Sequence, residues 1–350
     1  MIKDNFDIFE PVHHTLERHA EKYKKPFYFV DWAPLSLCNF SCNYCDPANY
    51  AGWYPEHNIQ DAKRFLDYIC ANTDQPLFFN INGGEPTLWK PLEEFCRYIK
   101  SKNEINQIRL ITNGTRSKKW WLDKADIIDQ VIVSLHYGQT KNEVIVDKFN
   151  ALYKTETDVA LHLMLDCYNF DSCVETYYYC KEHLDGPSLS VRPLRKTIIT
   201  SEHQPYTQEQ YKVMHNLTPI HGHKFNPQQS AMQWRNTQTK EIKPVISIDK
   251  DLLMAKQNNW QDWYCNIGIE TIVVNSKGGI KLGSSCFKFL ILGNISDNEY
   301  NLPLIPIKCK YQYCGCLTDL QTTKVKDLPQ GAKYIDTGIS SETIEVATRD

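Results

Sequence analysis

The segment Cys38-Asn39-Phe40-Ser41-Cys42-Asn43-Tyr44-Cys45 carries three thiols within eight residues, directly after an apolar stretch. Thiolates are the usual ligands of iron–sulfur clusters. A four-iron cluster has four irons to ligate, so three cysteines leave one iron open to another ligand. The same residues could also belong to a structural zinc site, in which cysteines are common ligands. The segment therefore predicts a metal centre whose surroundings decide its chemistry.

A repeating strand-then-helix pattern starts just before this segment. We expect six strands, at residues 27–36, 76–81, 107–112, 130–136, 159–165 and 189–192. Strands that alternate with amphipathic helices favour a parallel sheet with crossover helices. Six units are fewer than the eight of a closed barrel. The predicted fold class is therefore α/β, a partial (β/α)6 TIM-like barrel with its site at the carboxyl ends of the strands.

The last quarter of the chain has its own cysteine group, which contains Cys265, Cys286, Cys309, Cys314 and Cys316. Residues 271–274 and 280–282, joined by a glycine-rich connection, predict a β-hairpin between the first two of these cysteines. Because no secretory signal precedes them, metal explains the cysteines better than disulfides do. A small C-terminal domain with an auxiliary metal centre is expected, and structural zinc is the alternative.

These patterns predict how the chain is divided. We expect a helical lead-in at residues 1–26, the partial barrel at 27–200, a linker or substrate-facing region at 201–262, the auxiliary domain at 263–325 and a tail at 326–350. Within the lead-in, the helix is expected around residues 12–19.

Composition limits the possible partners. The 350 residues are 42% apolar, which suits a globular protein with a large core. A net charge of −3 gives no basic excess, so a nucleic-acid partner is not expected. The sequence has no signal peptide pattern and no apolar run long enough to span a bilayer. We expect a cytoplasmic protein without a membrane partner.

The Cys38-x3-Cys42-x2-Cys45 spacing, with Tyr44 before the last cysteine, resembles the cluster motif of the radical S-adenosylmethionine (radical SAM) enzymes. Gly83-Gly84-Glu85-Pro86-Thr87 resembles the glycine-rich motif of this family, and Thr112-Asn113-Gly114 and Ser134-Leu135-His136 fall where the family has further cofactor-contacting strand ends. The resemblance covers roughly residues 28–195. The C-terminal part resembles the auxiliary-cluster extensions called SPASM or twitch domains.

The resemblance implies a [4Fe-4S] cluster on Cys38, Cys42 and Cys45, with S-adenosylmethionine (SAM) chelated to the open iron. It also implies one-electron cleavage of SAM to a 5′-deoxyadenosyl radical, which abstracts hydrogen from a peptide or from a small molecule such as a sugar, alcohol or nucleoside. An external one-electron reductant, similar to flavodoxin or ferredoxin, would supply the electron. A non-catalytic iron–sulfur or zinc scaffold is the alternative of another class.

The resemblance further implies a set of cofactor-contacting residues: Tyr44, Gly83, Gly84, Glu85, Pro86, Thr87, Asn113, Ser134 and Arg192. The two glycines would let the backbone approach the cofactor. Glu85 would hold the methionyl amino group or orient its loop. Polar residues at strand ends also serve as caps and turn formers, which is the alternative for each of them.

Two further expectations concern cysteines. A fuller SPASM pattern has seven cysteines, whereas five are available here. A single auxiliary [4Fe-4S] cluster is therefore expected, with Cys265, Cys286, Cys314 and Cys316 as preferred ligands and Cys309 as substitute. Cys167, directly after the fifth strand, is a candidate hydrogen donor to a substrate radical, and a partly buried structural thiol is the alternative.

Overall fold

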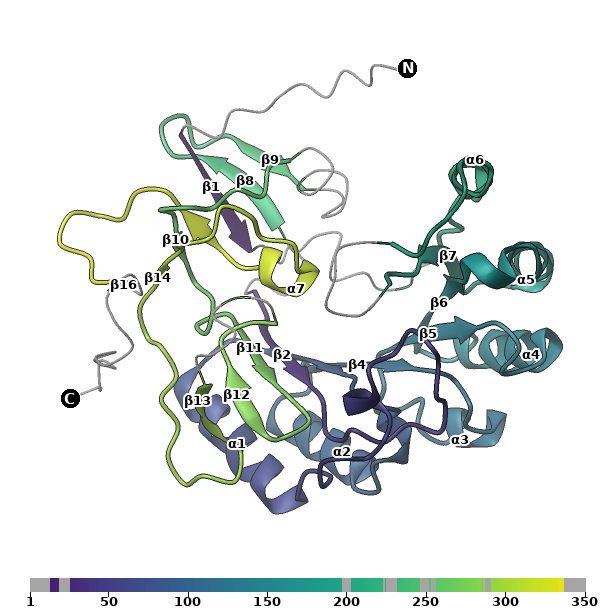
Figure 1. The fold of residues 1–350 in the computed structure, drawn as a ribbon. Coiled ribbons are helices and arrows are strands. Elements are labelled where there is room, and N and C mark those ends of the chain that lie inside the picture. The colour runs from purple at the N-terminus through teal and green to yellow at the C-terminus, as the bar shows by residue number, and fades with distance from the viewer. Residues whose placement is uncertain are drawn as a thin grey trace.

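The computed structural model describes residues 13–18, 26–196, 203–222, 224, 232–245, 252, 256–284, 286 and 291–336. Its strands form two sheets, and the larger has nine strands in the order β13-β12-β11-β2-β3-β4-β5-β6-β7 (Figure 1). Six of them are consecutive and parallel: β2 (Tyr28–Trp32), β3 (Leu77–Ile81), β4 (Gln107–Thr112), β5 (Gln130–His136), β6 (Asp158–Leu165) and β7 (Ser188–Pro193). The predicted partial barrel of six parallel strands is confirmed.

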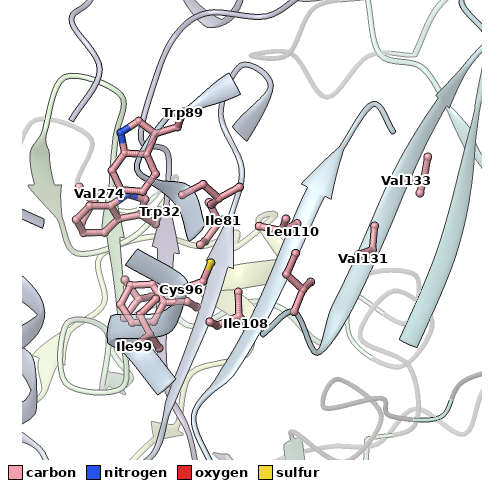
Figure 2. Close-up of a cluster of buried hydrophobic side chains, with 14 of the residues drawn as sticks. Trp32, Ile81, Trp89, Cys96, Ile99, Ile108, Leu110, Val131, Val133 and Val274 are labelled. Atoms are coloured by element: carbon pink, nitrogen blue, oxygen red, sulfur yellow. The ribbon is translucent and has the colours of Figure 1, made fainter. Parts of the chain in front are cut away.

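Helices cover the outer face of these strands: α1 (Ile59–Asn72), α2 (Leu92–Lys102), α3 (Lys118–Leu122), α4 (Asn142–Tyr153) and α5 (Phe170–His183). Alternate residues of each strand point to opposite faces. Trp32, Ile81 and Leu110 therefore point outward, into the apolar core that the strands share with α2 (Figure 2). The inner face is left for polar side chains and for the site.

The predicted hairpin is confirmed as β11 (Thr271–Val274) and β12 (Gly279–Lys281), followed by β13 (Ile291–Asn294). The sequence did not predict where the hairpin lies in the fold. In the structure, β11 pairs in parallel with β2. The hairpin thus extends the barrel sheet beyond its first strand, while other parts of residues 263–325 join the smaller sheet.

The smaller sheet has the order β16-β14-β10-β15-β1-β8-β9. Its strands are β1 (His14–Arg18), β8 (Met232–Asn236), β9 (Ile242–Pro244), β10 (Tyr264–Cys265), β14 (Ile307–Lys308), β15 (Lys324–Val325) and β16 (Ile335–Asp336). The helix predicted around residues 12–19 is wrong over His14–Arg18, which is a strand. Fully buried Leu16 lies opposite Trp234 of β8, so partners far along the chain override a weak local pattern.

The region predicted as a linker contributes ordered elements to both parts of the molecule. A helix expected near residues 208–217 is present as α6 (Gln208–Asn216), which Thr207 caps through a reciprocal capping box. Further along, β8 pairs with β1 and β9 forms one edge of the smaller sheet, so both strands of this region are part of a folded layer. No helix among the described residues is long and apolar enough to cross a membrane.

Candidate active site and a second cysteine group

An open cavity of about 180 Å³ lies at the carboxyl ends of the barrel strands. The predicted site residues that line it are Cys38, Tyr44, Cys42, Cys45, Gly83, Gly84, Asn113 and Ser134. The rest of the lining was not among the predicted contact residues, although Phe40, Thr112 and His136 belong to motifs quoted from the sequence: Phe40, Asn49, Tyr50, Asn82, Ile111, Thr112 and His136. Segments from β2, β3, β4 and β5 therefore meet around one hollow, as the strand order requires.

The three thiols of the cysteine segment are half-buried and face this cavity. Burial, together with the charges of Cys42 and Cys38, raises the pKa of Cys45 to about 11. Burial also raises the pKa values of Cys38 and Cys42, so all three groups are neutral thiols at neutral pH unless a cationic group binds to them. Within the described ranges, no three His, Cys, Asp or Glu side chains converge tightly enough to hold a single metal ion. Three thiols at one cavity are a donor set that fits an iron–sulfur cluster.

The glycine motif holds the cysteine segment through backbone contacts. A Cβ atom on Gly84 would lie 2.1 Å from the Leu37 carbonyl oxygen, and one on Gly83 would lie 2.8 Å from that of Leu35. The Gly84 N–H donates to the Leu35 carbonyl (3.2 Å), and the Glu85 N–H donates to the Leu37 carbonyl (2.8 Å). Both glycines line the cavity, but the closest approach they permit is to the segment that carries the thiols.

Glu85 lies beneath the cavity and is fully buried. Its Oε1 accepts hydrogen bonds from the Thr87 hydroxyl (2.6 Å) and the Thr112 hydroxyl (2.8 Å), and its Oε2 accepts from the Asn113 N–H (2.8 Å). It also caps the short helix Pro86–Leu88, and neither Pro86 nor Thr87 lines the cavity. This placement suits the orientation of loops rather than direct contact with a methionyl amino group.

Residues at the ends of β4 and β5 form the polar part of the cavity lining. Asn113 Nδ2 donates to Asn39 Oδ1 (2.8 Å) and lies 3.7 Å from Cys38 Sγ. Desolvation lowers the pKa of His136 to about 4, and its Nδ1 contacts the Tyr44 hydroxyl and lies 3.8 Å from Cys42 Sγ. His136 was not selected from the sequence, although it follows Ser134 by two residues and so shares its face of β5.

Residues 33–161 match the radical SAM superfamily. They form a radical SAM domain. GTP 3′,8-cyclase of Actinobacillus succinogenes is 30% identical over 112 residues, which are 30% of this chain and 32% of that protein. GTP 3′,8-cyclase of Helicobacter pylori is 30% identical over 131 residues, 36% of this chain and 41% of that protein. The chain thus spans less than half the length of these two relatives.

Among solved structures, anSMEcpe with bound AdoMet has a TM-score of 0.50, with 16% identity over 78% of this chain and 78% of that one. At this identity the similarity shows a shared fold. Radical SAM enzymes use SAM and a [4Fe-4S] cluster, and the cavity offers the thiols and polar strand ends that both require.

Besides Glu85, Pro86 and Thr87, two more predicted residues lie outside the lining of the radical SAM cavity. Arg192, on β7, is half-buried with Nη2 3.5 Å from His162 Nε2. Cys167 begins the short helix Cys167–Asn169, its N–H donates to Gln204 Oε1 (2.9 Å), and burial raises the pKa of its thiol. Their predicted roles as cofactor contact and hydrogen donor stay predictions.

The C-terminal cysteines gather outside the radical SAM domain. Cys265, Cys309 and Cys314 are buried, whereas Cys286 and Cys316 are half-buried, and all five are free thiols. Cys286 and Cys314 are hydrogen-bonded, which raises the pKa of the Cys286 thiol and lowers that of Cys314. Cys316 caps the short helix α7 (Leu317–Leu320), and burial followed by the charge of Asp319 raises its pKa.

Proposed function

We propose that this chain is a radical SAM enzyme that binds a [4Fe-4S] cluster through Cys38, Cys42 and Cys45, with SAM in the adjoining cavity. The observation that carries the proposal is the cavity itself, which three thiols, two glycines and the ends of β4 and β5 line together. When bound, the cluster and SAM supply a one-electron reductive cleavage that yields a 5′-deoxyadenosyl radical.

The residues of the chain hold and orient these groups. The cysteine segment presents three thiols to the cavity, and these thiols would hold the cluster. Asn113, Ser134 and His136 offer polar atoms to the SAM side of the cavity, while buried Glu85 fixes the end of β4 from below. The chain therefore contributes position and electrostatics, and the cofactors contribute the reaction.

The proposed substrate is a peptide or a polar small molecule. Polar and charged side chains, including Asp31, Arg109 and Ser190, alternate with the outward-facing apolar residues of the barrel strands, which supports a polar ligand inside the barrel. The solved structure of anSMEcpe with a Cp18Cys peptide has a TM-score of 0.50 and 17% identity, so it supports the architecture for either class. An external one-electron reductant completes the proposal.

The test is anaerobic reconstitution, followed by counting of iron and sulfide and by an assay for 5′-deoxyadenosine with SAM and dithionite. The expected result is deoxyadenosine from wild type and none from Cys42→Ala. Cys70→Ala is the matched control, because Cys70 is also half-buried but lies in α1, away from the cavity. A fully iron-loaded wild-type protein that leaves SAM intact would overturn the proposal.

A further inference from the structure

A polar layer lies on the inner face of the barrel sheet, just below the radical SAM cavity. Asp31 of β2, Asn80 of β3 and Arg109 of β4 are neighbours in the strand register. Two residues further along the chain from the last two of these, Asn82 and Ile111 line the cavity. Strands rise about 3.3 Å per residue, so the layer lies about 7 Å from this part of the lining. A substrate held at this layer therefore extends to the cavity.

Arg109 is the buried cation of the layer. Its neighbours Ile108 and Leu110 lie in the outer apolar core, so Arg109 points to the inner face. The residue is 4% exposed, and its guanidinium lies over the ring of Phe78, 5.0 Å from the centroid. Its Nε donates to Asn80 Oδ1 (2.7 Å), and no group in the described part of the chain accepts from Nη1 or Nη2. Buried donors without an acceptor cost free energy, which an acceptor atom on a ligand would recover.

Asp31 offers the matching acceptor. Its Oδ1 accepts from Nδ2 of Asn80 (2.6 Å) and from Nδ2 of Asn82. Among the residues that the structure describes, none donates to its Oδ2. Asn80 joins the two charged groups, since its amide donates to the carboxylate and accepts from the guanidinium of Arg109. The layer thus presents one acceptor oxygen and one donor edge on the two sides of Asn80.

The charges around the layer favour an uncharged ligand. Burial lowers the pKa of Arg109 to about 10, and the opposite charge of Asp31 limits this fall. Burial and, to a smaller extent, the charge of Asp319 raise the pKa of Asp31. On β5, opposite Arg109, Gln130 donates to the Asp158 carboxylate (2.9 Å). Carboxylates on both sides of the guanidinium would repel an anion, and Arg109 would repel a cation, so a neutral polar group fits best.

We propose that this layer binds an uncharged amide group of the substrate, whose carbonyl accepts from Arg109 and whose N–H donates to Asp31. In a trans amide the C=O and N–H point in opposite directions, so one amide can bridge the two residues across Asn80. The proposal rests on the radical SAM function and deepens it, because it defines a chemical group of the substrate. Its source is a peptide backbone or the carboxamide of a small molecule.

The test uses the reconstituted full chain with SAM bound and four probes that share a propionyl group. N-methylpropionamide represents a backbone amide, propionamide represents a carboxamide, methyl propionate lacks the N–H, and propionate is the anion. Ligand-observed NMR titration measures each affinity. Wild type is expected to bind one of the amides at least about tenfold more tightly than the ester, because the ester oxygen would face the Asp31 carboxylate. The preferred amide identifies the source.

Equal affinities for amide and ester, or no binding of either amide, would overturn the proposal, and so would a preference for propionate. Deoxyadenosine formation by wild type is measured in the same samples. A wild-type protein that cleaves SAM without distinguishing the probes overturns this inference alone. Iron-loaded wild type that leaves SAM intact overturns the function.

Two variants show whether the layer causes the preference. Asp31→Asn keeps the shape but replaces Oδ2 by a donor, so the amide-to-ester affinity ratio should fall about tenfold. Arg109→Lys keeps the charge but loses the planar fork, so both amides should bind more weakly. Arg64→Lys is the matched control, because Arg64 lies on α1, outside the barrel, and pairs with Asp61 (2.7 Å). An unchanged ratio in Asp31→Asn overturns the proposal; should that variant fail to fold, unchanged amide affinity in Arg109→Lys does so.

Discussion

The two cysteine groups differ in what surrounds them. Cys38, Cys42 and Cys45 lie in a loop, are half-buried and border an open cavity. Cys309 and Cys314 are buried under tryptophan and leucine side chains. Metal sites that bind a substrate keep an open position, and sites that do not are closed by protein ligands. The contrast supports the proposal that SAM binds at the first group, which borders the open cavity.

The groups also differ in how the chain assembles them. The first comes from one eight-residue segment, held by the adjacent glycine motif. The second draws on β10, the loop after β12 and the segment that follows β14. A substitution next to the cysteine segment can displace the whole first group. The second group depends instead on the pairing of several strands in the smaller sheet.

The largest expected effect comes from removal of one thiol in each group. Cys42→Ala should abolish deoxyadenosine formation and leave about four irons in the auxiliary centre. Cys314→Ala should also leave about four irons but should still cleave SAM in the absence of substrate. Iron counting and the deoxyadenosine assay separate these outcomes. Loss of all iron in either variant would contradict the independence of the two groups.

The next effect concerns the backbone approach behind the first group. Gly84→Ala would push a Cβ atom against the Leu37 carbonyl, 2.1 Å away, so the cysteine segment must move. We expect most of the iron of the first group to be lost while the auxiliary cluster stays. Gly138→Ala is the control for backbone strain without a steric clash, because φ is +73° there and nothing lies within 4 Å of the added Cβ. Equal loss of iron in both variants would show that clearance at Gly84 does not matter.

The first group could be predicted from the sequence because its residues are close in the chain and each strand carries a local pattern. All six parallel strands follow from that pattern, the thiols follow from their spacing, and Asn113 and Ser134 follow from the family resemblance. The strand His14–Arg18 could not be predicted, because it pairs with β8, more than 200 residues away. Pairing at that distance leaves no pattern in the local sequence.

A moderate effect is expected from the two buried carboxylates that hold the cysteine-bearing loops. Glu85 serves the first group and Asp319 the second, and each accepts backbone N–H groups while buried. Glu85→Ala leaves buried donors without an acceptor and should cost about 3 kcal/mol of unfolding free energy. Urea unfolding of the metal-free protein measures this cost.

The conservative variants sharpen the comparison between the two carboxylates. Glu85→Gln should reduce iron in the first group only, and Asp319→Asn should reduce iron in the second only. Glu85→Ala with wild-type stability would contradict the role assigned to this carboxylate.

The smallest expected effect is a pH dependence at the junction of the two regions. His57 lies between the cysteine segment and α1, is 5% exposed and bonds through Nε2 to the Asn275 carbonyl of the C-terminal hairpin (3.1 Å). Desolvation lowers its pKa from 6.5 to about 4. Above pH 6.5 the imidazole is neutral in the folded and the unfolded chain and contributes no pH dependence. As the pH falls from 6.5 towards 4, the unfolded chain takes up a proton that the folded chain refuses, so stability is lost.

Between about pH 7 and about pH 5, the loss at His57 is about 2 kcal/mol. Urea unfolding of the metal-free protein at about pH 7 and about pH 5 gives the drop for wild type and for His57→Gln, which cannot titrate there. Wild type should lose more unfolding free energy between the two pH values than His57→Gln does. The difference between these two losses gives the contribution of His57 alone, because the other histidines are the same in both proteins. Equal losses of unfolding free energy in wild type and His57→Gln would mean that His57 is hydrated in the folded state. The C-terminal hairpin would then not exclude water from His57.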